Sequence, residues 1–437
     1  MTSPETAVCT MDTAALDALR QERIDWRFRS AAPALTGLTL AEAADRRLNL
    51  FTDGFFAPFV VLDDEALEHN LRTMAAWCAA RGVVLAPHGK TTMAPQLFAR
   101  QIEHGAWGVT CANAGHLRIY RAFGVSRILL ANQLLDPAGL CWLAAALAAD
   151  PGFEFVCWVD SVRGVELMTE ALEGAERPVD VLVELGADGG RTGVRDTATA
   201  LAIAEAIHAS PVLRLRGTGG YEGALSHDTD DAALAKISSY VDGLRDLAIS
   251  FADKGLLDGQ IIVTAGGSAY FDQVANELTK PWPDGLDVLP VLRSGAYLTH
   301  DDGFYREISP LGDHPRIDGV DSFRPALRAW AQVTSKPSDE LALLTIGKRD
   351  ASFDEGMPEP QLRRTPGGPA EPLEGHVVAK MNDQHAFLTL PAGSPVEVGD
   401  WIGLGLSHPC TVFDKWPLIP VTAGDGETVV DLVRTWF

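Results

Sequence analysis

The stretch FVCWVDSVRGVELMTEALEGAERPVDVLVE, residues 155–184, shows the pattern on which this chain is built. It begins with the apolar run 155–159, continues through an amphipathic segment at 162–172, and ends on a second short apolar run at 181–184. Continuous apolar runs are typical of strands covered on both faces. A helix-length segment between two of them predicts a parallel βαβ unit.

The same alternation covers the chain from residue 59 onward. The other strand-like runs are 59–62, 83–86, 107–110, 128–131, 213–216 and 261–264, and further helical patterns lie at 65–80, 94–103, 116–123 and 198–209. Eight strand–helix units are the number found in a (β/α)8 barrel of the TIM type. The sequence therefore predicts an α/β fold with such a barrel at residues 58–285. A doubly wound parallel sheet is the alternative.

The pattern changes after about residue 285. Short strand-like segments follow with little helix between them, at 329–333, 341–346, 376–379, 386–390, 400–406 and 429–430. They predict a second, mostly β domain at residues 286–437, with residues 1–57 placed against it. The proline- and glycine-rich segment 357–374 is predicted to be an irregular surface loop.

Composition excludes several classes of partner. The 437 residues are 46% hydrophobic and carry 59 acidic against 36 basic side chains, a net charge of −23. Such a globular, acidic chain offers no positive surface for nucleic acid or an anionic membrane. No secretory signal is evident, the apolar run 139–149 is too short to span a bilayer, and the six cysteines form no framework. We therefore expect a cytoplasmic protein with mostly buried free thiols.

Two nucleotide-binding motifs fail when read residue by residue. Gly89-Lys90-Thr91 resembles the end of a P-loop, but Val84 stands where its first glycine should be. The glycine-rich stretch 217–223 has its third glycine displaced by one position, and no helical pattern follows at once.

Polar residues instead follow one strand after another. In a barrel the C-terminal ends of the strands form one rim, and that rim carries the chemistry. The rim residues are His88, Gly89, Lys90, Asn113, Asn132, Gln133, Asp160, Glu184, Asp188, Arg191, Tyr221, Glu222, Gly266, Gly267 and Ser268.

Two of these groups suggest a cofactor. Lys90 follows an apolar strand and Pro87, and a partly desolvated lysine has the depressed pKa that Schiff-base formation needs. Gly266-Gly267-Ser268 follows the eighth predicted strand, at the usual phosphate site of barrels. Together they suggest pyridoxal 5′-phosphate. The alternatives are a surface lysine and a simple turn.

The other rim residues each have a purely structural interpretation beside the functional one. Arg191 lies in a glycine-lined loop, where it is either a ligand contact or a surface arginine, and Tyr221 is either a site or a core tyrosine. Glu184 and Asp160 could form a glycosidase carboxylate pair.

Ser407-His408-Pro409-Cys410 places an imidazole and a thiol two positions apart. On an extended segment these side chains share a face, and nitrogen with sulfur favours zinc. The alternative is a packed histidine beside a buried cysteine. His385 is either a third polar group nearby or a turn histidine.

Together these residues resemble the D-serine dehydratase and D-threonine aldolase family, the metal-activated branch of the alanine-racemase-fold (type III) pyridoxal-phosphate enzymes. The resemblance runs from about residue 58 to the end of the chain. It rests on Pro87-His88-Gly89-Lys90-Thr91, the 128–133 segment, Gly190-Arg191-Thr192-Gly193-Val194, Gly220-Tyr221-Glu222-Gly223, Gly266-Gly267-Ser268, Asp383-Gln384-His385 and His408-Pro409-Cys410, in that order.

The resemblance implies a role for each motif. Lys90 would hold the cofactor as a Schiff base, with Gly266, Gly267 and Ser268 on its phosphate. Arg191 would face the pyridoxal hydroxyl and Tyr221 the ring nitrogen, while His88 and Gln133 are expected beside the cofactor. His408 and Cys410 would hold a divalent metal, zinc first and manganese or magnesium as alternatives. Members of the family are typically homodimers.

The activity implied is dehydration of a D-β-hydroxy amino acid such as D-serine to a 2-oxo acid and ammonia, with Lys90 removing the α-proton. The alternative is aldolase cleavage to glycine and an aldehyde, with His385 as the base; a second alternative is a non-catalytic cofactor carrier. The His-x-Cys pair is the dehydratase-like form. Thr91-Thr92-Met93 departs from many relatives, which have a second histidine and lysine there.

Overall fold

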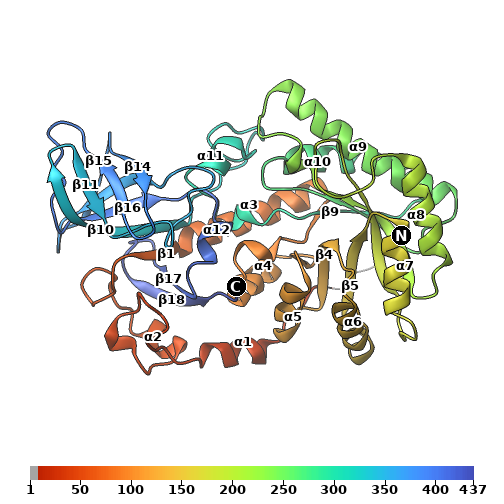
Figure 1. Ribbon diagram of the computed structural model, residues 1–437, viewed down its shortest axis with the longest axis horizontal. Coiled ribbons are helices and arrows are strands. Elements are labelled where there is room, and N and C mark those ends of the chain that lie inside the picture. The colour runs from red at the N-terminus through yellow and green to blue at the C-terminus, as the bar shows by residue number, and fades with distance from the viewer. Residues whose placement is uncertain (1–7) are drawn as a thin grey trace.

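The computed structural model describes residues 8–437, which form two sheets (Figure 1). The first has eight parallel strands in the order β2-β9-β8-β7-β6-β5-β4-β3. Their bounds are β2 Val84–Leu85, β3 Val109–Cys111, β4 Arg127–Gln133, β5 Glu154–Val159, β6 Val179–Leu185, β7 Leu213–Gly220, β8 Ile261–Ala265 and β9 Val288–Leu292. A parallel bridge between His88 and Thr110 joins the two ends of this order, so the sheet curls into a barrel.

Helices on the outside of the barrel alternate with its strands (Figure 1). They are α3 Asp64–Arg81, α4 Pro95–Glu103, α5 Ala114–Ala122, α6 Pro137–Ala149, α7 Val162–Ala171, α8 Thr197–Ala209, α9 Asp231–Asp253 and α10 Phe271–Leu278. The helices predicted at 65–80, 94–103, 116–123, 162–172 and 198–209 all correspond to helices of this set.

The second sheet is mostly antiparallel. Its main path is β13-β12-β16-β10-β1-β17-β18, and β11, β15 and β14 continue it beyond β10. The strands are β1 Phe59–Asp63, β10 Leu327–Ser338, β11 Leu341–Leu344, β12 Glu359–Arg364, β13 Ala370–Pro372, β14 Val377–Met381, β15 Ala386–Thr389, β16 Trp401–Gly405, β17 Leu418–Thr422 and β18 Val429–Arg434. The prediction of an α/β barrel with a second, mostly β domain is confirmed.

One strand lies in a different sheet from the one predicted, and one strand of the barrel was not predicted. The run at 59–62, counted as the first barrel strand, is β1, which pairs antiparallel with β10 and parallel with β17. The eighth barrel strand is β9, beyond residue 285. A short apolar run shows that a strand is buried, but it does not show which sheet covers it. The domain boundaries at residues 58 and 285 remain a prediction. Strand β1 begins just after the first boundary and β9 just after the second.

The prediction of an irregular loop at 357–374 is wrong. Strands β12 and β13 form an antiparallel hairpin there, with Leu362 opposite Pro372, and β12 also pairs with β16. Because β13 is the edge of the sheet, Pro372 withholds no hydrogen bond from a neighbouring strand.

Residues 24–55 pack against the second sheet, while Cys9 and Met11 pack against the barrel. This N-terminal segment contains α1 Thr13–Arg20 and α2 Leu40–Asp45. Buried side chains between Ile24 and Phe55 share a hydrophobic cluster with Phe59, Trp330 and Trp401 of that sheet.

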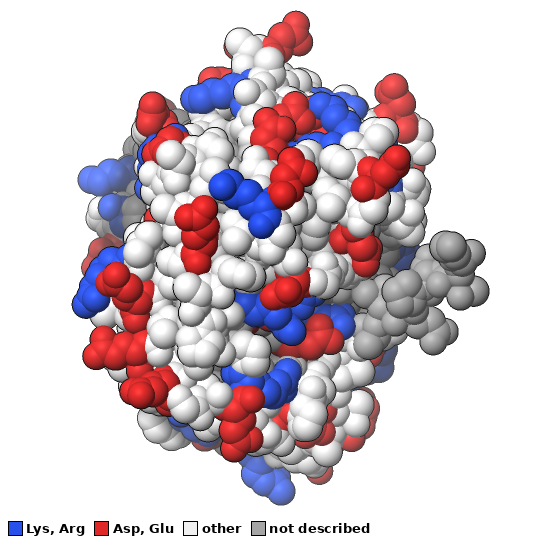
Figure 2. Space-filling model, turned by 90° about the vertical axis from the view of Figure 1, so that its right-hand side faces the viewer, with Lys and Arg blue, Asp and Glu red and all other residues white. Residues whose placement is uncertain are grey.

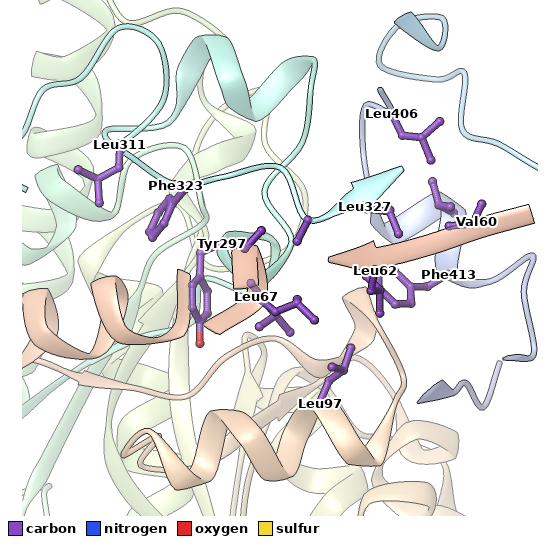
Figure 3. Close-up of a cluster of buried hydrophobic side chains, with 14 of the residues drawn as sticks. Val60, Leu62, Leu67, Leu97, Tyr297, Leu311, Phe323, Leu327, Leu406 and Phe413 are labelled. Atoms are coloured by element: carbon purple, nitrogen blue, oxygen red, sulfur yellow. The ribbon is translucent and has the colours of Figure 1, made fainter. Parts of the chain in front are cut away.

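One buried cluster joins the barrel to the second domain (Figure 3). Leu67 of α3 and Leu97 of α4 lie near Leu62 of β1 and Phe413 of the short helix α12, Cys410–Phe413. Phe413 is fully buried. This packing holds the segment around residue 410 against the barrel.

The surface carries both signs of charge. Figure 2 shows acidic and basic side chains interspersed over the face that lies at the right in Figure 1. Among residues 8–437 we find no helix with the length and apolarity that a membrane crossing requires.

Candidate active site

A cavity of about 650 Å³ opens at the C-terminal ends of the barrel strands and extends to α12. Most of the residues predicted for the site line it, namely His88, Lys90, Arg191, Tyr221, Gly266, Gly267, Ser268, His408 and Cys410. Gln133 and His385 do not. The barrel and the second domain therefore contribute to one site within a single chain.

Lys90 lies in a tight turn, Gly89–Thr91, which follows β2 after the short link 86–88. Gly89 is required there, because a Cβ at this position would lie 2.5 Å from the Tyr120 hydroxyl of α5. Burial lowers the pKa of the Lys90 ammonium, and the positive charges of Arg191 and Arg293 lower it further. A lowered pKa increases the fraction of neutral amine, the form that attacks a carbonyl.

Arg191 and Tyr221 lie side by side at the cavity wall. The guanidinium carbon lies 4.7 Å from the centroid of the Tyr221 ring, a cation–π contact. Burial raises the pKa of the Tyr221 phenol to about 12, so it keeps its proton at neutral pH.

The Arg191 loop is held by the two carboxylates that could have formed a glycosidase pair. Thr192 donates to Glu184 at 2.8 Å, and the backbone N–H of Gly193 donates to Asp160 at 3.1 Å. Gln133 donates to Glu184 at 2.5 Å. Both carboxylates therefore anchor the Arg191 loop. Gln133 supports the loop indirectly, through its hydrogen bond to Glu184.

The backbone N–H groups of Gly266 and Gly267 already have an acceptor. They donate at 2.9 and 2.6 Å to the fully buried carboxylate of Glu222. Ser268, Gly295 and Ala296 line the cavity, and among residues 8–437 their backbone N–H groups donate to no protein group. These three N–H groups and the Ser268 hydroxyl suit a phosphate, so the donor set fits a phosphate-bearing cofactor beside Lys90.

Arg293 also lines the cavity and was missed from the sequence. It is 4% exposed, donates to the Thr264 hydroxyl at 2.6 Å, and lies 4.8 Å from the Trp158 ring centroid. Burial lowers its pKa to about 10. The signal was available, because Arg293 directly follows β9, but no strand was predicted at residues 288–292 and this segment was assigned to the second domain.

His408 and Cys410 line the cavity from the second domain. The segment is not extended as predicted, since His408 is left-handed with a φ of 52° and Cys410 begins α12. The Cys410 thiol donates to the Thr91 hydroxyl at 3.4 Å, next to Lys90. Both side chains face the cavity because the turn, rather than a strand, brings them to one side.

Asp354 and Asp301 position His408. The His408 Nδ1 lies 2.6 Å from an Asp354 oxygen, and the His408 backbone N–H donates to Asp301 at 3.1 Å. Its hydrogen bond with Cys410 and the Asp354 carboxylate raise the pKa of His408 to about 9. Within residues 8–437, no group of three or more His, Cys, Asp or Glu side chains is arranged to hold a metal ion.

His385 does not line this cavity. It is exposed, in the turn between β14 and β15, and its backbone carbonyl accepts the N–H of Asn382. Its predicted role as a base therefore stays a prediction.

Replacing Arg191 by glutamine should shift the pH dependence of cofactor capture by Lys90. Removing a nearby positive charge stabilises the ammonium, so the Lys90 pKa rises and the neutral amine forms at higher pH. We expect the midpoint of the capture rate, followed by visible absorbance after adding pyridoxal phosphate, to move up by about 0.5–1 pH unit. Arg163→Gln, on an exposed side chain of α7, should leave the midpoint in place. A shift to lower pH would contradict the electrostatic explanation.

Comparison with known proteins places two domain types along the chain. Residues 62–276 match the family described as "Alanine racemase, N-terminal domain", and residues 326–422 match the one described as "Putative serine dehydratase domain".

Several characterised proteins are similar over most of their length. A D-threonine aldolase from Arthrobacter is 28% identical over 80% of this chain and 85% of its own. A D-threo-3-hydroxyaspartate dehydratase from Delftia is 27% identical over 87% of this chain and 96% of its own. The structure of a D-threonine aldolase from Filomicrobium marinum superposes with a TM-score of 0.74, at 25% identity, covering 87% of this chain and 95% of that one.

A D-threo-3-hydroxyaspartate dehydratase has also been solved as two alanine variants. One replaces a histidine and the other a cysteine two positions further along, the latter in a metal-free form.

Proposed function

Because this chain belongs to the alanine-racemase-fold (type III) pyridoxal-phosphate enzymes, with a serine dehydratase-like second domain, we propose that it dehydrates D-β-hydroxy amino acids such as D-serine. It is a pyridoxal-phosphate-dependent lyase. The products would be a 2-oxo acid and ammonia. The observation that carries the proposal is that Lys90, with its lowered pKa, and the His408–Cys410 pair line one cavity.

The residues that would hold the cofactor follow five strands of the barrel, β2, β6, β7, β8 and β9. The Lys90 amine would bind the aldehyde carbon, and the free N–H groups of Ser268, Gly295 and Ala296 would receive the phosphate. Arg191 and Tyr221 would flank the ring. When bound, the cofactor withdraws electrons from the substrate α-carbon and so makes its proton acidic.

Lys90 is the residue suited to take the α-proton. Its side chain is a primary amine that lines the cavity, and in its neutral form it can accept a proton. Burial first, and then the charges of Arg191 and Arg293, lower the pKa of Lys90, which increases the fraction of neutral amine that can act as a base.

His408 and Cys410 would bind a divalent metal, zinc first, with manganese or magnesium as alternatives. Nitrogen and sulfur donors suit zinc, and two protein ligands leave positions open for water and substrate. Asp354 occupies Nδ1 of His408, which directs the other ring nitrogen to the ion. When bound, the metal acts as a Lewis acid on the substrate hydroxyl.

The pair also favours dehydration over aldol cleavage. A D-threo-3-hydroxyaspartate dehydratase has a histidine and a cysteine at the same spacing, and its cysteine variant was solved metal-free. Aldolase cleavage to glycine and an aldehyde is the second candidate, since aldolases are among the relatives of similar identity. A cofactor carrier without activity has no such support. A homodimer and a cytoplasmic location remain predictions.

A panel of D-β-hydroxy amino acids tests the proposal. Purified protein loaded with pyridoxal phosphate and zinc is incubated with D-serine, D-threonine and D-3-hydroxyaspartate, and ammonia, 2-oxo acid and aldehyde are measured together. We expect ammonia and 2-oxo acid in equal amounts from at least one D-substrate, and none from its L-enantiomer. Aldehyde and glycine without ammonia would transfer the assignment to the aldolase.

A further inference from the structure

An unassigned imidazole, His116, lines the same cavity as Lys90. It lies in the first turn of α5, where the Asn113 side chain accepts its backbone N–H at 2.9 Å. Its ring stacks on Tyr120 with 6.5 Å between centroids, and Tyr120 packs against Gly89, next to Lys90. The helix therefore holds the imidazole beside the turn that carries the lysine.

No protein group fixes the proton of this ring. Its Nδ1 is buried without a hydrogen-bond partner, and no acceptor or donor in residues 8–437 engages Nε2. Burial first, and the charge of Lys90 second, lower the pKa of His116. The ring is therefore neutral near pH 7 and able to accept a proton from the cavity side.

The other two cavity-lining histidines of the described chain are less suited to exchanging protons. His88 is more deeply enclosed, and burial together with the charges of Lys90 and Arg293 lowers its pKa well below the ordinary value. His408 is bound by Asp354 and adjoins Cys410. His116 has neither constraint, and the charged and titratable groups that face it are Lys90 and His88.

We infer that His116 is a catalytic residue that carries the α-proton from Lys90 to the departing β-hydroxyl. The inference rests on the proposed dehydration. Lys90 Nζ takes the α-proton, His116 Nε2 receives it from the resulting ammonium, and the imidazolium gives it to the hydroxyl oxygen. The Cα–H electron pair becomes the second bond between Cα and Cβ, while the Cβ–O pair leaves with the oxygen as water. No further reactant is needed.

The test separates removal of the α-proton from loss of the hydroxyl. Cofactor-loaded wild type and His116→Gln are incubated with D-serine in deuterated water, and ammonia and α-deuterium in recovered D-serine are measured. We expect ammonia release by the variant to fall about 100-fold or more, with deuterium exchange within a factor of about three of wild type. His208→Gln, exposed on α8, is the matched control and should change neither rate.

Several results would overturn the inference. Ammonia release near the wild-type rate would do so, as would an equal fall in both rates or the same split produced by His88→Gln instead. His116→Asn replaces glutamine if the first variant does not fold, judged by circular dichroism and visible cofactor absorbance. If wild type gives neither ammonia nor exchange, it is the proposed function that fails.

Discussion

Lys90→Ala is expected to abolish the visible absorption of the lysine-bound cofactor and to reduce turnover by about 10⁴-fold or more. The substitution removes the amine that would bind the aldehyde and also the base placed to take the α-proton. Both losses follow from one side chain, because within residues 8–437 Lys90 is the only lysine that lines the cavity. The measurement is an absorption spectrum after dialysis against pyridoxal phosphate, followed by an ammonia assay with D-serine.

A matched lysine on the outside of the barrel provides the control. Lys254→Ala, at the end of α9, removes an exposed amine that pairs with Glu205, so spectrum and turnover should match wild type. A Lys90→Ala protein that kept the visible band would show that another amine holds the cofactor.

Cys410→Ala is expected to keep the cofactor band but lose the bound metal and reduce turnover by at least about 100-fold. The thiol is removed while His408 keeps its contact with Asp354, so the remaining single ligand is too weak to hold zinc. The substitution also removes the thiol that donates to the Thr91 hydroxyl beside Lys90, but it leaves the Lys90 amine itself in place. Metal content by mass spectrometry and ammonia release are measured on the same preparation.

Cys141→Ala is the control, since Cys141 is a free and exposed thiol on α6. It should retain both metal and activity. Full turnover by metal-free Cys410→Ala would contradict a catalytic metal at this pair.

The barrel could be predicted because its strands are buried on both faces and alternate with helices. Strands β5 and β6 and the helix between them follow the pattern in the sequence closely. The error at β1 arose because its residues Phe59–Asp63 are just as apolar, although they pair with β10 of the other sheet. Pairing between distant segments decides the sheet, and a local pattern does not contain it.

The residues of the candidate site were likewise only partly predictable from the sequence. Lys90 and Arg191 could be found because each stands in a distinctive local motif at a strand end. Glu222 could not be predicted to satisfy the amides of Gly266 and Gly267, since that contact joins two separate loops. His116 carries no motif either, and it becomes visible only when α5 is seen packed against the Lys90 turn.

Ammonia release from D-serine by the protein loaded with pyridoxal phosphate, measured before chelation, after chelation and after zinc is restored, tests the central claim most directly. The account predicts steady ammonia and 2-oxo acid formation, loss of both on chelation, and recovery with zinc. Ammonia formation that chelation leaves unchanged, or none from D-serine and every other D-β-hydroxy amino acid in the panel, would contradict it.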